Sequence, residues 1–435
     1  MAPPDDVIGE ELRQRLALRT VRNVVHLTLP QGGEERYRLA AERLEGWIRD
    51  GFMAQERDPA LYLYRQTFKG PDGRFYVRTG FLGLVRLEPE GGSIRHHEHT
   101  LANPLGDRFR LIRATRTQLS PVFLLYSDPE GAALRSLEAR VTTERRGPRP
   151  IGGTGFGRRA TELTPGAALE FNDDEGVRHW MQPITDGPTI EQVRRRLAEL
   201  PVVIADGHHR YSAALEHSER LRRAFPGEDP DLPEHFMLAC FVRAEDPGLV
   251  VQPTQRIVQA MAGEPPTGSE ALLRALSVRF EIQSLDLPAA SHSTEAPTPL
   301  KYEPSRRVVI GARFAGDTRL HVLLLRPGDG PFEGTAVQPL LRNLDVTVLH
   351  KLILEPLFGL DDAAVAKGGR LLYDRDPSRA ASKAASGEAS AVFFLRPIAA
   401  STVFDITAHG LKLPLESTHF APELASGLVL HRMGV

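Results

Sequence analysis

The sequence predicts a mixed α/β (α+β) fold, with mixed sheets flanked by helices. Three observations favour it. Apolar runs of strand length alternate along the chain with segments of helical periodicity. A buried strand at 202–206 runs directly into a polar turn and a helix. Two alternating stretches, 60–68 and 75–89, flank the sequence Gly-Pro-Asp-Gly and are typical of paired strands.

The composition indicates an ordinary globular protein. Of 435 residues, 41% are hydrophobic and 25% are charged, and the formal net charge is -2. Nucleic-acid-binding domains are usually strongly basic, so we expect no nucleic-acid partner. Cys240, the single cysteine, lies in an apolar run, which predicts a core residue in a reducing compartment. The sequence lacks a membrane-spanning apolar stretch and a signal peptide, so we expect a cytoplasmic protein.

The amino-terminal part alternates between predicted strands and helices. The apolar stretch 23–30 predicts a strand, and 35–51 predicts an amphipathic helix that ends at Gly51. Residues 99–141 predict a loop, a helix, a strand and a helix in that order. Residues 143–167, rich in glycine, proline and arginine, predict an exposed loop or insertion.

The rest of the chain continues this alternation. Residues 189–201 predict a helix with Thr189 as its N-cap, which leads into the strand at 202–206. The polar segment 286–305 predicts a linker or long loop. The other expected elements are helices at 212–227, 343–359 and 379–389 and strands at 235–242, 306–314, 318–327 and 391–397.

These segments predict the domain organisation. Two α/β parts flank a central core, and loops separate the three. The predicted boundaries are an N-terminal part at 1–142, a loop at 143–167, a core at 168–285, a linker at 286–305 and a C-terminal part, completing the site, at 306–435.

The turn that follows the strand 202–206 is the strongest candidate site, and its residues are Asp206, Gly207, His208, His209 and Arg210. Backbone N–H groups and the dipole of a helix N-terminus favour an anion, and Gly207 lets the backbone approach it closely. Arg210 adds donors suited to phosphate or carboxylate. Asp206 suits Mg²⁺, or the orientation of a histidine or a substrate hydroxyl. The alternative is that Asp206 is only an N-cap and the histidines are surface residues.

Arg210 is also expected to be a surface residue with few contacts. On that expectation, Arg210→Ala abolishes anion binding and costs little stability.

Several stretches occur in one characteristic order along the chain. They are "APPDDVI", "NVVHLTLP", "HEHTL", "RLIRATRTQLSPVFLLYSD", "DEGVRHW", "IADGHHRYSAAL", "PTQRIV", "LDVTVLHKLILEPLFG" and "STHFAPELASGLVL". In this order they resemble the bacterial and archaeal domain-of-unknown-function family 1015 over almost the whole chain. Relatives usually have tyrosine in the first motif and one more strand before it. Either the start of this chain is truncated or that strand is absent.

The Asp-Gly-His-His-Arg turn is more distantly similar to the strand–turn–helix of the ParB/sulfiredoxin superfamily, over about residues 165–245. That superfamily includes CTP-binding partition proteins, ATP-dependent sulfiredoxins and kinases of free serine, and there the turn binds nucleotide phosphates. The resemblance implies a ParB/sulfiredoxin-like core around the turn. It also implies ATP or another nucleotide, with Mg²⁺, as cofactors.

A histidine-rich stretch offers candidates for acid–base chemistry. On a strand, His97 and His99 share one face and Glu98 takes the other. With the family resemblance, His97, Glu98 and Thr100 become candidates for a second wall of the site. The alternative is a solvated, histidine-rich strand end. A metal site is not expected, because no third ligand follows at a recognisable spacing.

Two further stretches carry candidate phosphate contacts. Arg110 and Arg113 lie three residues apart on one helix face, with Thr115 nearby, although such spacing usually gives a solvated basic face. Thr254 and Arg256 fall in "QPTQRIV", where the family usually has Pro-Thr-His-Arg.

The family resemblance also shows departures. Gln255 replaces a titratable histidine in that motif. Ser417 and Thr418 belong to a stretch that usually reads Lys-Ser-Thr-x-Phe-x-Pro-Lys, but Glu416 and Glu423 replace its lysines here. A carboxylate at these positions repels phosphate, or recruits a metal ion or a cationic substrate. The departures therefore indicate a changed substrate or a lost activity.

The first predicted function is an ATP-dependent kinase of a small, serine-like hydroxyl metabolite, or a related phosphoryl-transfer enzyme. In this hypothesis Asp206 would hold Mg²⁺, which would neutralise charge on the phosphates, and Glu98 or His97 would take the proton of the acceptor hydroxyl. The catalytic candidates are Asp206, His208, His209, Glu98 and His97. The phosphate- or nucleotide-binding candidates are Gly207, Arg210, Arg110, Arg113, Thr115, Thr254, Arg256, Ser417 and Thr418.

The second predicted function is a nucleotide-binding switch without catalysis, or a degenerate family member. A scaffold with structural histidines ranks last, because ligands of α/β sheets gather at the carboxyl ends of strands. The expected partners are a small-molecule substrate, a nucleotide and a second copy of the chain in a homodimer. Neither nucleic acid nor a membrane is expected.

Overall fold

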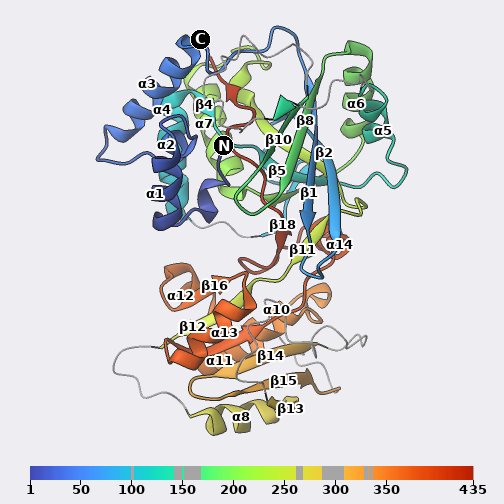
Figure 1. The fold of residues 1–435 in the computed structure, drawn as a ribbon. Coiled ribbons are helices and arrows are strands. Elements are labelled where there is room, and N and C mark those ends of the chain that lie inside the picture. The colour runs from blue at the N-terminus through green and yellow to red at the C-terminus, as the bar shows by residue number, and fades with distance from the viewer. Residues whose placement is uncertain are drawn as a thin grey trace. The chain divides into compact units, whose positions relative to one another are not determined.

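The computed structural model describes residues 1–98, 102–141, 149–150, 168–260, 268–286, 308–327, 332 and 337–434. The chain folds into two compact units (Figure 1). The first unit comprises Met1–His96, Thr100–Val250 and Phe420–Val435, and the second comprises His97–His99 and Val251–His419. Strands β11 (Val250–Gln252) and β18 (His419–Ala421) lie where the chain passes from one unit to the other.

The first unit is built on a nine-stranded sheet. Its strands in chain order are β1 (Leu61–Lys69), β2 (Phe75–Arg86), β3 (Ile94–His96), β5 (Val122–Tyr126), β6 (Arg149–Pro150), β7 (Leu169–Asn172), β8 (Arg178–Ile184), β9 (Val202–Asp206) and β10 (Phe236–Arg243). Their order in the sheet is β3-β9-β5-β10-β2-β1-β8-β7-β6. The sheet contains both parallel and antiparallel pairs, so the predicted mixed α/β class is confirmed.

The interior position of β9 explains its apolar sequence. It pairs in parallel with β3 and antiparallel with β5, and Asp206 at its end lies opposite Phe123. Val203 and Ile204 are fully buried, as expected for a strand covered on both faces. The predicted strand at 202–206 and the predicted hairpin of β1 and β2 are confirmed. Cys240 is a buried core residue of β10, as expected, and burial raises the pKa of its thiol to about 12.

Helices surround this sheet (Figure 1). They are η1 (Asp5–Val7), α1 (Glu10–Arg19), α2 (Val25–Thr28), α3 (Arg36–Arg49), α4 (Ala102–Thr115), α5 (Ala132–Glu138), α6 (Gly187–Ala198), α7 (His208–Ala224) and η3 (Pro233–His235). Apolar residues of α5, α6 and α7 join the main core of the sheet. A separate apolar cluster joins α1 to α4. A short pair of strands, β4 (Thr117–Gln118) and β19 (His431–Arg432), completes the unit.

A buried guanidinium fixes the C-terminal segment of the first unit. Arg78 on β2 donates to the side-chain oxygen of Gln66 and to the carbonyl oxygens of Phe420, Ala421 and Pro422. Burial lowers the pKa of Arg78, and the carbonyl dipoles replace the water it has lost. The end of β18 and the residue that follows it are therefore held by a buried charge inside the unit.

Two local predictions were wrong. Residues 23–30 form the short helix α2, because the Asn23 side chain accepts from the N–H of Val25 and His26 bonds to the carbonyl oxygens of Ala17 and Thr20. The N-cap of α6 is Asp186, which accepts from the N–H and the hydroxyl of Thr189.

The second unit contains a six-stranded sheet in which every pairing is antiparallel. Its strands are β12 (Gln255–Gln259), β13 (Phe280–Asp286), β14 (Val309–Phe314), β15 (Arg319–Leu325), β16 (Leu371–Asp374) and β17 (Ala389–Phe394). Their order is β13-β15-β14-β17-β12-β16. The predicted strands in this part of the chain are confirmed.

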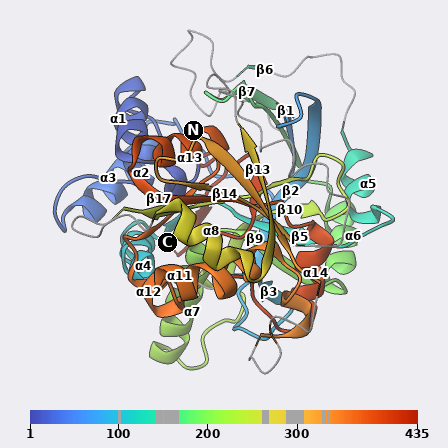
Figure 2. The ribbon, with the colours of Figure 1, turned by 90° about the horizontal axis from the view of Figure 1, so that it is seen from below.

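Helices cover both faces of this sheet (Figure 2). They are α8 (Ser269–Ser277), η4 (Pro339–Leu341), α10 (Asp345–Leu349), the π-helical turn η5 (His350–Leu354), α11 (Glu355–Phe358), α12 (Asp362–Lys367), α13 (Pro377–Ser386) and α14 (Ala400–Ala408). Ala380 and Ala384 of α13 pack on one face, and apolar residues of α8 and α10 to α11 pack on the other. The helix predicted at 343–359 is thus confirmed, with a π turn inside it.

The predicted loops at 143–167 and 286–305 lie mostly outside the described residues, and the domain boundaries that they mark stay predictions. In the part of the chain that the structure describes, none of the helices has the length and apolar character needed to cross a lipid bilayer.

Candidate functional site

The turn between β9 and α7 has a backbone that only glycine fits. Gly207 has a φ of 90°, in the left-handed region that side chains disfavour. A Cβ there would lie 3.0 Å from Val122 Cγ1 and 3.1 Å from Arg210 Cζ. Gly207 is also the N-cap residue of α7 and has no side chain to cap the first-turn N–H groups. The turn therefore presents the N-terminus of a 17-residue helix without a side-chain cap from its N-cap position.

The buried side chain of Arg210 holds this turn in place. Only 7% of the residue is exposed, and its guanidinium donates to the Asp206 carboxylate and to the carbonyl oxygen of Pro121. Asp6 lies 3.6 Å from the same guanidinium. Burial alone would lower the pKa of Arg210, but these carboxylates outweigh it and raise the pKa. The expectation that Arg210 is a surface residue with few contacts was therefore wrong.

Carboxylates outnumber guanidinium groups around the turn. Asp5 and Asp6 form part of η1, and Asp5 lies 2.9 Å from Arg108. Burial raises the pKa of Asp5, against the pull of Arg108. The Asp206 side chain keeps 35% of its area exposed at the end of β9. Sequence reasoning missed the two N-terminal aspartates, although they belong to the "APPDD" motif that it singled out.

The two histidines of the turn differ in their surroundings. Burial lowers the pKa of His209, so its ring is neutral at pH 7, and its buried Nδ1 has no hydrogen-bond partner among the described residues. The ring of His208 lies 5.8 Å from that of His96, which contacts Tyr211 edge-on. His209 therefore has a buried, neutral ring with one nitrogen that lacks a hydrogen-bond partner among the described residues.

The basic residues of α4 make local contacts. Arg110 is exposed and lies 3.5 Å from Glu34, and Arg113 is exposed as well. The buried Thr115 donates its hydroxyl to the carbonyl oxygen of Leu111 at 2.8 Å. Arg110 and Arg113 thus lie on a solvated helix face, and Thr115 lies on the buried side of the same helix. A phosphate role for the three residues stays a prediction.

Two stretches that lie far apart in the sequence meet in the second unit, around Glu98. The N–H groups of Ser417 and Glu416 donate to the two carboxylate oxygens of Glu98, each at 3.0 Å, and Thr418 N–H donates at 3.2 Å. A left-handed Glu416, with φ of 54°, points these consecutive N–H groups to one side. His97 Nε2 lies 2.8 Å from the Thr418 hydroxyl and 3.2 Å from Glu98. We call this loop, residues 416–418, the carboxylate nest.

The nest keeps Glu98 ionised. Burial pushes the pKa of Glu98 upward, but His97, the hydrogen bond from Thr418 N–H and Arg256 together hold it below the ordinary value. Of the sequence candidates, His97, Glu98, Ser417 and Thr418 are thus brought together. Thr100, with the neighbouring His99, lies outside the described residues.

Arg256 is fully buried in the same unit. Its guanidinium donates to the carbonyl oxygens of Thr254 and Leu415, each at 2.8 Å, and covers the ring of Tyr373 at 4.8 Å. Its Nε lies 3.5 Å from His350 Nε2 at the start of the π turn. Burial and Arg256 lower the pKa of His350 to about 3, so this histidine is neutral.

Sequence reasoning missed His350 and Tyr373. The available signal for His350 was the motif "LDVTVLHKLILEPLFG", which contains it. In the structure this motif includes the π turn, and π turns are frequent at functional sites. Two polar atoms near Arg256 are buried without a hydrogen-bond partner among the described residues: the Thr254 hydroxyl and the Tyr373 hydroxyl. Gln255, in place of the family's histidine, instead accepts from the N–H of Leu395 at 3.1 Å, which is a structural contact.

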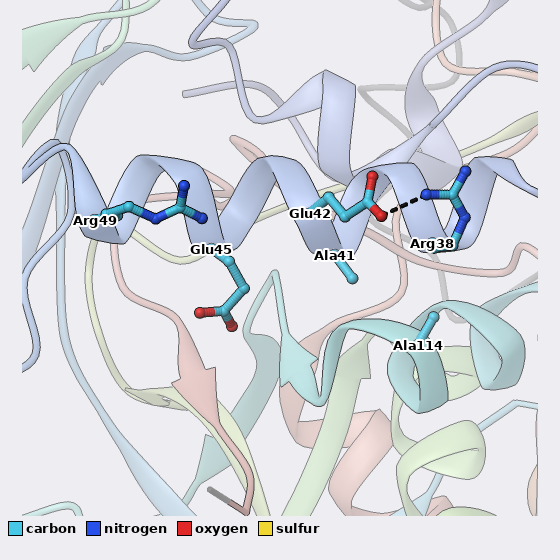
Figure 3. A pocket seen from close by; sticks show the side chains of 6 residues that line it. All are labelled: Arg38, Ala41, Glu42, Glu45, Arg49 and Ala114. Carbon is cyan, nitrogen blue, oxygen red and sulfur yellow. Dashed lines mark hydrogen bonds and ion pairs between the residues drawn. The ribbon is translucent and has the colours of Figure 1, made fainter.

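Two surface hollows have linings that do not include these residues. One of about 400 Å³ lies between α3 and α4 (Figure 3) and is lined by Arg38, Ala41, Glu42, Glu45, Arg49 and Ala114. Another, of about 660 Å³, is lined by residues that include Leu221, Phe225 and Arg432. The described residues also contain no group of three or more histidine, cysteine or acidic side chains placed to hold a metal ion.

The family comparison identifies one model. Residues 1–150 and 157–347 match the family described as "Protein of unknown function (DUF1015)". No curated protein matches the chain.

Several solved structures are similar to the chain at a low level. A conserved hypothetical protein from Pyrococcus furiosus has a TM-score of 0.34 and 12% identity, covering 79% of this chain and 94% of its own. A variant of free serine kinase in complex with AMP has a TM-score of 0.36 and 11% identity, with 79% and 91% covered. SbnI with a C-terminal truncation, from Staphylococcus aureus, has a TM-score of 0.31 and 11% identity, with 79% and 84% covered. These TM-scores are too low for the likeness to support a fold or a function.

Arg210→Ala should destabilise the first unit strongly. It leaves the carboxylates of Asp206 and Asp6 without their buried counter-charge, which costs about 3 kcal/mol in comparable sites. The free energy of unfolding from urea titration measures the effect. Arg223→Ala, an exposed position on the same helix, is the control and should change it by less than about 0.5 kcal/mol. Equal stability of the two variants would contradict the locking role of Arg210.

Glu98→Gln should lower the melting temperature at neutral pH, and the difference from wild type should shrink on acidification. The pKa of Glu98 is depressed in the folded protein, so its stabilisation is present above the ordinary value of 4.5 and is lost as pH falls through the folded value. Thermal denaturation between pH 7 and about pH 3 measures this. Glu388→Gln, at an exposed position, should show no such trend. A difference that stays constant with pH would show that the nest does not hold a charge.

Proposed function

The chain belongs to the family "Protein of unknown function (DUF1015)", and we propose that it binds a nucleotide at the turn 206–210 and transfers a phosphoryl group to a small hydroxyl metabolite. The observation that carries the proposal is the N-terminus of α7, where Gly207 provides the left-handed backbone and leaves the first-turn N–H groups without a side-chain cap from the N-cap position. Phosphate groups favour such a position, because first-turn N–H groups and the helix dipole both stabilise negative charge.

The negative charge around the turn indicates that a metal ion would accompany a bound phosphate. Asp206, Asp6 and Asp5 would repel a nucleotide phosphate if no cation lay between them. Mg²⁺ commonly uses one or two carboxylates and completes its coordination with phosphate oxygens and water. The half-exposed Asp206 carboxylate fits that donor set, so it is the residue that would hold the ion. Bound Mg²⁺ would supply charge neutralisation at the phosphate oxygens.

Glu98 is the proposed proton acceptor, with His97 beside it. A base must be unprotonated at working pH, and the depressed pKa of Glu98 provides that state. Its Oε2 accepts one backbone N–H, while Oε1 accepts several hydrogen bonds. Oε2 is therefore the atom with capacity left for a substrate hydroxyl.

The finer parts of the proposal rest on the sequence resemblance. A ParB/sulfiredoxin-like core around residues 206–210 would explain why a strand, this turn and a helix follow one another. Kinases of free serine occur in that superfamily, so a serine-like hydroxyl metabolite is the proposed acceptor. In this account His209 contacts the bound phosphates through the ring nitrogen that lacks a protein partner.

A nucleotide-binding switch without catalysis is the second candidate. The carboxylate nest favours it, because a Glu98 that accepts from three N–H groups is a weak base. In that case nucleotide binding would change the association of two copies of the chain and would not lead to turnover.

The test combines binding and transfer. Melting temperatures are measured with Mg²⁺ and ATP, ADP, CTP or GTP, and transfer of labelled phosphate is followed with free serine and a panel of hydroxy acids. A ligand at a hundred times its dissociation constant stabilises by about 2.7 kcal/mol, so binding is readily detected. Asp206→Asn should lose the Mg²⁺-dependent part of that shift, and Asp50→Asn, at the exposed end of α3, should keep it.

Binding with transfer that Glu98→Gln abolishes supports the kinase. Binding with no transfer, and a nucleotide-dependent change in oligomeric state, supports the switch. No shift with any nucleotide overturns both.

A further inference from the structure

A serine, a histidine and an aspartate form a hydrogen-bonded chain at the edge of the second unit's sheet. Ser284 on the edge strand β13 pairs directly across from His321 on β15. Ser284 Oγ lies 2.9 Å from His321 Nδ1, and His321 Nε2 lies 2.9 Å from Asp317 Oδ2. None of these residues belongs to the turn at 206–210 or to the carboxylate nest.

The chain of hydrogen bonds determines which atom holds each proton. Arg319 donates to both carboxylate oxygens of Asp317, at 3.1 and 3.2 Å, and its backbone N–H donates as well. Burial would raise the pKa of Asp317, but these bonds and His321 hold it far below the ordinary value. An ionised Asp317 can only accept, so the proton of His321 lies on Nε2. Nδ1 is then the acceptor of the Ser284 hydroxyl proton.

Position and burial suit the roles of nucleophile and base. His321 is fully buried and its ring stacks on Phe314 with centroids 5.6 Å apart, which fixes its orientation. Ser284, in contrast, is exposed at the sheet edge. A serine–histidine pair also occurs in the first unit, where Ser218 Oγ lies 2.7 Å from His235 Nδ1; His235 Nε2 lies 2.9 Å from Glu228 but forms no hydrogen bond among the described residues. There the serine is fully buried and cannot meet a reagent.

We propose that Ser284 is a nucleophile for acyl transfer from carboxylic esters or thioesters, activated by His321 and oriented through Asp317. Ser284 Oγ forms a bond to the acyl carbon, and its proton passes to His321 Nδ1. The bond from the acyl carbon to the leaving alcohol or thiol breaks, and His321 returns the proton to that group. Water then hydrolyses the acyl-serine, with His321 again taking and returning a proton.

A cation, Arg319, lies near the serine–histidine pair and is itself paired with Asp317. Arg319 lies on the same strand face as His321, two residues away, and its side chain is 44% exposed. Asp286 lies opposite Arg319 on β13. Among the described residues, the charged groups at this edge of the sheet include Asp317 and Arg319 from the hairpin of His321, Asp286 from the neighbouring strand, and Glu270 of α8, which acts on Arg319.

Labelling with a fluorophosphonate tests the nucleophile directly. The full-length protein is treated with the reagent and the modified residue is located by mass spectrometry. We expect modification at Ser284, at least tenfold faster than at Ser277, an exposed serine of α8 whose hydroxyl donates to the carbonyl oxygen of Arg274. The buried Ser218 should stay unmodified. Hydrolysis of p-nitrophenyl acetate should fall at least tenfold in Ser284→Ala and stay unchanged in Ser277→Ala.

Variants of the two supporting residues separate activation from stability. His321→Gln should lose labelling while circular dichroism stays that of a folded protein. Asp317→Asn should slow labelling and move the midpoint of its pH profile downward, because the imidazolium loses its carboxylate partner. Labelling of Ser284 no faster than Ser277, or a rate unchanged in His321→Gln, would overturn the proposal. An unmoved pH midpoint in Asp317→Asn would overturn the orienting role of Asp317.

Discussion

A buried guanidinium between β9 and α7 determines the geometry of the candidate site in the first unit. Arg210 must be compensated where it lies, and it takes Asp206, Asp6 and the Pro121 carbonyl as partners. Those contacts tie the end of a strand, the start of a helix and the N-terminal segment together. Gly207 is required by the same arrangement, since a Cβ there would approach the guanidinium itself. The first turn of α7 is thereby held in place without a side chain of its N-cap residue over it.

The first unit buries a positive charge at its candidate site, whereas the second unit buries a negative charge. There a carboxylate is enclosed, and three consecutive backbone N–H groups stabilise its ionised form. Arg256 nearby takes backbone carbonyl oxygens as partners, and neutral His350 lies against it without competing for charge. Both clusters are therefore built around charged groups that are costly to bury. Groups whose burial lowers the stability of the fold are typical of functional sites.

Much of the fold could be predicted from the sequence, because strand and helix periodicities are local signals. The strands at 202–206 and 235–242 and the helix α3 followed from apolar patterns alone. The segment 23–30 did not, because a side-chain cap from Asn23 and long-range bonds of His26 override its apolar pattern. The sequence also could not place Arg210, because the partners that bury it lie about 90 and 200 residues away along the chain. The meeting of Glu98 with residues 416–418 was anticipated only through the family resemblance.

The most direct test of the phosphate-binding account is an amide chemical-shift titration of the full-length protein with Mg²⁺ and ADP. The account predicts that the N–H signals of Gly207, His208 and His209 shift first and saturate together, since these groups would contact the phosphates. A control titration with Mg²⁺ alone should leave the His208 and His209 signals nearly unmoved. Saturable shifts confined to other parts of the chain, or no shifts at millimolar nucleotide, would contradict the assignment of the turn as a phosphate site.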